Sequence, residues 1–117
     1  MFEIRSQQMS VFNSLAEKHF VRKVSERLAM RFPDEVSKLN LQAIDLCDFI
    51  EQRMIEARIH GIKNQDDLIR YIDYLLLYRK EFEGLPQIQE ILNRTDLSGR
   101  AKMEEIDEYV LFTHQEG

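Results

Sequence analysis

Cysteine, proline, glycine and tryptophan are all scarce in this chain. Among 117 residues there are one Cys, two Pro, four Gly and no Trp. The single thiol, Cys47, excludes an internal disulfide and fits a reducing compartment. So few turn-forming residues argue against a many-stranded β-sandwich, while a hydrophobic share of 44% is too high for a disordered chain. The composition predicts a helical fold in a single domain, residues 1–117.

Long apolar runs and an excess of positive charge are also missing. No window approaches the roughly 18 uncharged apolar residues of a membrane span, and the opening residues place Glu3 where a signal peptide needs an apolar core. We therefore expect a cytoplasmic protein with no membrane association. The net charge of -5 lacks the clustered Lys and Arg needed to neutralise phosphates, so nucleic acid is a disfavoured partner.

Recognisable catalytic motifs are absent from the sequence. The four Gly residues form no phosphate-cradling loop and no nucleophile elbow. His19, His60 and His114 lie far apart, with no second His or Cys at metal-ligand spacing. Only Glu56 and His60, at i and i+4, offer half of a metal site, and the alternative is a surface ion pair. We expect no bound metal, no cofactor and no enzymatic activity.

Helical periodicity dominates what the sequence does contain. Apolar residues recur every three or four positions until Pro33, which predicts a first helix over about residues 7–32. After a short connecting segment at residues 34–39, Asn40 is the expected cap of a second helix that ends at Gly61. Its inward face is predicted to consist of six residues: Ala43, Leu46, Cys47, Ile50, Met54 and Ala57.

The later part of the chain predicts two long helices and a short one between them. Asn64 is the expected cap of a helix over residues 65–83, whose apolar arc of about 220° marks a central helix or one that faces a partner. Its aromatic stripe is assigned to the core in preference to a base-stacking surface: Tyr71, Tyr78 and Phe82. Pro86 suits the start of a short helix. Ser98 is the expected cap of the last helix, whose inward face is Met103, Ile106, Tyr109 and Val110.

These elements predict an all-α bundle of four main helices plus one or two short ones. Leu111 and Phe112 fall off the inward face of the last helix, so they are either exposed at a frayed end or docked onto something else.

Charge is divided unevenly along the chain. Residues 1–39 hold 7 Lys or Arg against 5 Asp or Glu, whereas residues 40–117 hold 9 against 16. Lys23, Arg27 and Arg31 repeat at four-residue spacing on the first helix, and the last helix is acidic. The basic stripe is either a flank that pairs with the last helix or a docking surface for an acidic partner.

The second helix also carries carboxylates that suggest acid–base chemistry. Asp45, Asp48 and Glu56 share one face with Gln52. That face lies opposite the apolar one, so we interpret it as a solvated surface. Cys47 is expected to point into the core, where burial raises a thiol pKa and suppresses its nucleophilicity.

Several landmarks together resemble a known group of proteins. They are Ile4, Arg5, Gln8 and Met9 in the opening; Phe32-Pro33; Gly61-Ile62; Tyr71-Ile72-Asp73; Phe82; and Pro86 followed by Ile91-Leu92. Over residues 4–106 this order resembles small all-helical accessory proteins encoded in bacterial type VI secretion clusters, beside cargo effectors and spike proteins. The resemblance implies an adaptor or co-chaperone that binds an effector or its loading protein in the cytoplasm, and it implies no catalytic residue.

The favoured hypothesis is therefore a non-enzymatic protein-binding module. Its partner would be a secreted effector, a spike protein or an adaptor, held by the first helix and exposed parts of the third. The residues expected to bind it are Phe12, Leu15, His19, Lys23, Arg27, Arg31, Tyr74 and Leu77. Three alternatives stay open: an immunity protein that neutralises a co-encoded toxin, a small metal-dependent hydrolase built on the second helix, and a homodimer formed through the third helix.

Overall fold

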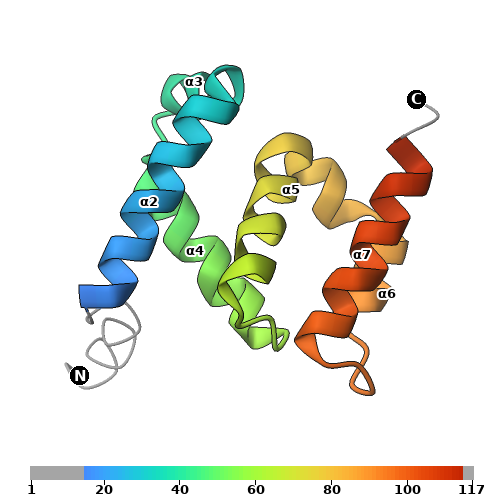
Figure 1. The fold of residues 1–117 in the computed structure, drawn as a ribbon. Coiled ribbons are helices and arrows are strands. Elements are labelled where there is room, and N and C mark those ends of the chain that lie inside the picture. The colour runs from blue at the N-terminus through green and yellow to red at the C-terminus, as the bar shows by residue number, and fades with distance from the viewer. Residues whose placement is uncertain (1–14, 115–117) are drawn as a thin grey trace, which may run out of the picture. The chain divides into compact units, whose positions relative to one another are not determined.

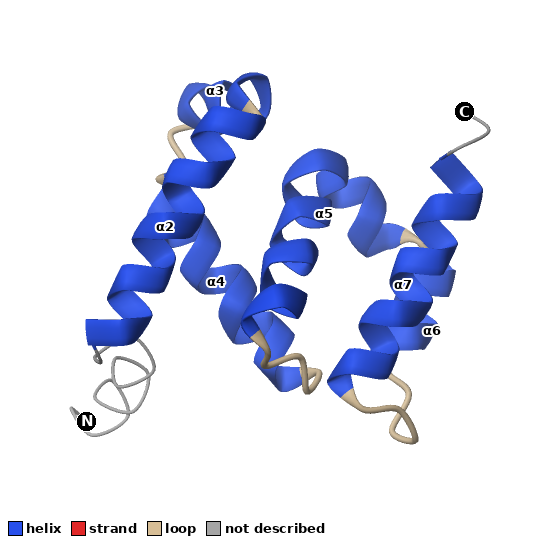
Figure 2. Ribbon diagram, in the orientation of Figure 1, coloured by secondary structure: helices blue, strands red, loops and turns tan. Residues whose placement is uncertain are grey.

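Helices are the only regular elements in the part of the chain that the structure describes. This computed structural model describes residues 15–114, without the side chains of residues 79–81, 83, 113 and 114. Figure 2 shows helices joined by short loops, so the all-α fold class is confirmed. The helices, labelled in Figure 1, are α2 (Leu15–Arg31), α3 (Pro33–Leu41), α4 (Leu46–Ile59), α5 (Gln65–Gly84), α6 (Pro86–Leu92) and α7 (Gly99–His114). None of these described helices is long and apolar enough to cross a membrane.

The chain divides into two compact units, and each is described by itself. The first spans residues 1–52 and the second residues 53–117, so the boundary falls within α4. The single domain expected from the sequence stays a prediction.

In the first unit, Pro33 ends α2 and begins α3. It stands at the first position of α3, where the missing backbone N–H costs no helical hydrogen bond. The segment expected as a short connection is therefore a helix, a correction to the sequence prediction. α2 and α3 pack on each other, and α2 contributes Phe20, Val24 and Leu28 to the buried core.

The turn after α3 contains a residue with left-handed backbone geometry. Ala43 has φ +61°, and the turn is closed by the Ala43 N–H donating to the Asn40 oxygen at 3.0 Å and the Ile44 N–H donating to the Leu39 oxygen at 2.9 Å. These two bonds make a Schellman motif, in which the left-handed position usually holds glycine. Ala43 is thus exposed in a turn and not on a buried helix face, as the periodicity had predicted.

The cap of α4 also differs from the prediction. Asn40 lies inside α3, and Asp45 caps α4 by accepting a hydrogen bond from the Asp48 N–H at 3.0 Å. The buried face is rotated toward Phe49, which is buried, and away from Cys47, which is exposed. The prediction of a core cysteine is therefore wrong. Partial burial, followed by the charge of Asp45, raises the pKa of the Cys47 thiol.

In the second unit, Gly61 ends α4 as predicted. Its φ of +85° suits glycine, and the Ile62 N–H donates to the Ala57 oxygen at 2.9 Å in a second Schellman motif. Gly99, at the start of α7, lies against this turn. A Cβ atom on Gly99 would lie 1.9 Å from the Gly61 oxygen, so only glycine permits the approach.

Helices α5, α6 and α7 pack on one another in the second unit. Of the aromatic stripe assigned to the core, Tyr71 and Phe82 are buried and Tyr78 is half-buried. The buried hydrophobic residues among the described side chains of α5 are Leu68, Tyr71, Ile72, Leu75, Leu76 and Phe82. Asn64 occupies the N-cap position of α5, and Ser98 caps α7 by accepting a hydrogen bond from the Ala101 N–H at 3.2 Å. α7 directs Met103 and Ile106 into the core, while its predicted inward residues Tyr109 and Val110 are half-buried.

Candidate functional site

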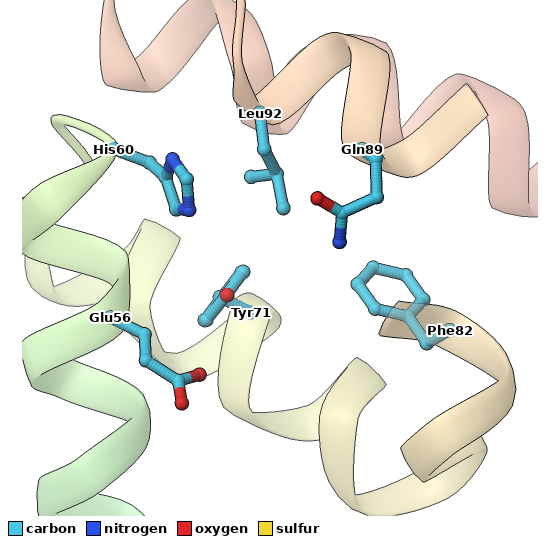
Figure 3. Close-up of a pocket in the computed structure, with 6 residues that line it drawn as sticks. All are labelled: Glu56, His60, Tyr71, Phe82, Gln89 and Leu92. Atoms are coloured by element: carbon cyan, nitrogen blue, oxygen red, sulfur yellow. The ribbon is translucent and has the colours of Figure 1, made fainter. Parts of the chain in front are cut away.

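The second unit contains a small cavity between the end of α4, α5 and α6. It encloses about 230 Å³, and Figure 3 shows its six lining residues: Glu56, His60, Tyr71, Phe82, Gln89 and Leu92. Leu92 and Gln89 descend from α6 toward Tyr71 and Phe82 of α5. Tyr71, Phe82 and Leu92 are buried and form an apolar floor, whereas Gln89 is exposed at the rim.

His60 faces this cavity from the turn after α4. Burial, and then the positive charge of Lys102, lowers the pKa of the imidazole, while a hydrogen bond to the Leu92 backbone acts in the opposite direction. The unprotonated ring is therefore favoured at neutral pH. A neutral imidazole can accept a proton or a hydrogen bond, but it needs a positioned partner for either role.

Glu56, the other polar wall of the cavity, is already engaged. Its carboxylate forms an ion pair with Arg53 on the same helix at 2.9 Å. Tyr71 and Gln89 also take part in interactions with their surroundings. Within residues 15–114, no three His, Cys, Asp or Glu side chains come together as a metal site.

Lys102 is the most buried cation of the described chain, and sequence reasoning missed it. Its Nζ donates to the His60 oxygen at 3.0 Å and to the Leu92 oxygen at 2.8 Å. These carbonyls lie at the ends of α4 and α6, where helix dipoles favour a positive charge. A signal was present, because Lys102 precedes the buried Ile106 by four residues and so shares its face.

A polar network joins α5 to α7 beside the core. Arg70 forms ion pairs with Asp67 on its own helix and with Asp107 on α7. The Tyr74 hydroxyl donates to Asp107 at 2.5 Å, and burial together with this bond raises the pKa of Tyr74. Asp67, in the first turn of α5, is buried.

Two expected partner-binding residues on α5 are partly buried within the protein. Tyr74 is half-buried, bonds to Asp107 and stacks with Tyr78 and Phe82 at centroid distances of 6.3 and 5.7 Å. Leu77 is also half-buried. Neither forms an open apolar patch, and their binding role stays a prediction.

The remaining expected partner-binding residues belong to the first helix. Phe12 lies outside the described residues. Leu15, His19, Lys23 and Arg31 are exposed on α2, and Arg27 is half-buried. The structure adds Met30, which the sequence reasoning did not select and which is 83% exposed. Four of the expected partner-binding residues are therefore exposed on one helix, together with Met30.

The carboxylates of α4 are placed differently from a catalytic pair. Asp45 and Asp48 are exposed, and the Asp45 side chain is occupied in capping the helix. Glu56 is directed to the cavity and to Arg53. The three carboxylates do not converge on one point of the described structure.

No family model matches the chain, and no curated protein or solved structure matches it either.

Proposed function

We propose that this protein is a non-enzymatic accessory protein of a bacterial type VI secretion cargo cluster. It binds an effector, or the protein that loads it, as an adaptor or co-chaperone in the cytoplasm. The secretion context rests on the resemblance of residues 4–106, and the binding role rests on the surface of α2.

The observation that carries the binding role is an exposed apolar and basic face on α2. Leu15 is 72% exposed and Met30 is 83% exposed, although both are large hydrophobic side chains. At about 100° per residue, one arc of about 80° contains five exposed residues: Leu15, His19, Lys23, Glu26 and Met30. We call this group the α2 face. Flexible Met side chains are common on surfaces that bind protein partners.

The charge on α2 indicates the chemistry of the partner. Lys23 and Arg31 are exposed, and Arg31 also lies over the Phe32 ring, with its guanidinium carbon 5.8 Å from the ring centroid. An acidic partner would be attracted to these cations before contact, which speeds association at low salt. Arg27, being half-buried, contributes less to such a surface.

Affinity capture tests this function. The tagged full-length protein is used to capture partners from native cell extract, and mass spectrometry identifies whatever co-purifies at a fixed ratio. We expect one effector or loading protein. The double variant Leu15→Ser/Met30→Ser should weaken its capture by about tenfold or more, because exposed apolar anchors carry much of an interface's binding energy. Leu41→Ser is the matched control, since Leu41 is 87% exposed on α3.

Two outcomes would contradict the proposal. A homo-oligomer that captures no other protein would contradict the adaptor role. Equal capture by the α2 variant and the Leu41 control would contradict the assignment of the α2 face as the binding surface. Co-expression with the captured effector separates the remaining roles. A chaperone raises the abundance of the effector, whereas an immunity protein rescues cells from its toxicity.

A further inference from the structure

A second surface of the protein lies in a groove between α6 and α7. The groove encloses about 380 Å³ and is lined from both helices at matching intervals. The α6 side consists of Gln87, Glu90, Ile91 and Arg94, and the α7 side of Glu105, Glu108, Tyr109 and Phe112. The α7 set follows a spacing of i, i+3, i+4 and i+7, which forms a continuous helical stripe about 10 Å long, whereas Arg94 on the other side lies two residues beyond the end of α6. Such a groove accommodates about two turns of another helix.

The floor of the groove is apolar and ends in an exposed aromatic ring. Ile91 and Tyr109 are half-buried, and Phe112 is 68% exposed. The sequence left Phe112 either exposed at the end of the helix or docked, and the structure places it on the groove wall. An exposed aromatic side chain beside partly buried apolar neighbours is typical of a protein-binding surface.

The rim of the groove is acidic. Glu90, Glu105 and Glu108 are exposed along it. Among the described residues that line the groove the one cation is Arg94, which is engaged by Asp96 through two hydrogen bonds at 2.6 and 3.0 Å. Arg94 also interacts electrostatically with Glu105 and Glu90. The groove therefore presents three carboxylates around an apolar floor, which complements a helix with one apolar and one basic face.

We propose that the groove between α6 and α7 binds a basic amphipathic helix of a partner protein. Apolar side chains of that helix pack on Ile91, Tyr109 and Phe112, and its Lys or Arg side chains reach the glutamates. This surface carries charge opposite to that of α2 and does not depend on the function proposed above.

A direct binding assay with a defined probe tests the groove. The probe is a fluorescent 14-residue peptide with Leu on one helical face and Lys on the other, and its counterpart carries Glu in place of Lys. Fluorescence anisotropy with the full-length protein should give a dissociation constant on the order of tens of micromolar for the basic peptide, because two helical turns bury less than a standard interface. We expect affinity to fall severalfold between roughly 20 and 200 mM salt.

Variants on α7 provide matched controls for the groove. Phe112→Ser and Glu105→Lys/Glu108→Lys should each weaken binding by about tenfold. Leu111→Ser and Glu104→Lys should not, since Leu111, 54% exposed, and Glu104 lie on the same helix outside the lining. All five substitutions in these four variants are at exposed positions, and circular dichroism verifies that each variant keeps its helices.

Three results would overturn the proposal. The first is equal loss of affinity in the groove variants and the controls, and the second is equal binding of the acidic and basic peptides. The third is a homodimer of the wild-type protein, measured by sedimentation, that Phe112→Ser dissociates, because the occupant would then be a second copy of this chain. Capture of a partner through α2 can succeed or fail independently of each of these results.

Discussion

The contact between Gly99 and the turn at Gly61 makes a sharp prediction for the variant Gly99→Ala. A Cβ atom on residue 99 would lie 1.9 Å from the Gly61 oxygen, 2.4 Å from the Gly61 carbonyl carbon and 2.7 Å from the Ile62 Cα atom. All three neighbours are backbone atoms, so no side-chain rotation relieves the overlap. The start of α7 must move away from the turn by on the order of 1 Å.

The size of the effect follows from two opposing contributions. Overpacking typically costs about 1–3 kcal/mol, and a rigid backbone contact belongs at the upper end. Alanine recovers up to about 1 kcal/mol in helix propensity. We expect a net loss of about 2 kcal/mol from the free energy of unfolding. Gly84→Ala is the matched control: Gly84 ends α5, and its added Cβ meets no atom within 4 Å. It should be neutral or slightly stabilising.

Tyrosine fluorescence during urea unfolding measures this loss of unfolding free energy in the second structural unit, to which Gly99 belongs. All four Tyr residues lie within residues 53–117, and the chain has no Trp, so the signal reports the second unit alone. The Gly99→Ala midpoint should fall by on the order of 1–2 M urea. A free energy of unfolding within about 0.5 kcal/mol of wild type would refute the close approach of α7 to the Gly61 turn.

Three further predictions follow from single contacts. Ala43→Gly should stabilise the first unit by about 1 kcal/mol, because the backbone φ of +61° at this position favours glycine. Thermal unfolding followed by circular dichroism tests this, and a lower unfolding midpoint in the variant would contradict it. Lys102→Met should destabilise the second unit by about 2–4 kcal/mol, because two buried carbonyls lose a charged donor; a tyrosine-fluorescence urea midpoint unchanged from wild type would count against it. The lowered pKa of His60 means that the unfolded chain binds more protons below about pH 6.5, so stability should fall as pH falls from about 7 to 5. Urea titrations at several pH values should show that the free energy of unfolding falls less for His60→Gln than for wild type over this pH range. An identical fall in both proteins would exclude His60 as the cause.

The local elements of the fold were largely predictable from the sequence. Three helix boundaries depend on local chemistry: the missing N–H of Pro33, the left-handed turn at Gly61 and the capping hydroxyl of Ser98. Each affects only its own segment of the chain. The wide apolar arc of α5 also identified a helix that packs on more than one side.

The remaining features depend on contacts distant in sequence or on a small rotation of a helix. The approach of Gly99 to Gly61 joins residues that no local pattern connects. Cys47 is exposed and Phe49 is buried because the buried face of α4 is rotated slightly from the predicted one. Met30 does not share the four-residue spacing of the basic stripe, and its exposure depends on which side of α2 is covered.

Site-specific photo-crosslinking in native cells tests the proposed binding surface most directly. A photoreactive amino acid placed at Met30, on the α2 face, should crosslink to one partner encoded with the secretion cluster. The same group at Leu41, equally exposed on α3, should crosslink to no partner at comparable yield. A partner captured from Leu41 but not from Met30, or no crosslink from either position, would contradict the assignment of α2 as the docking helix.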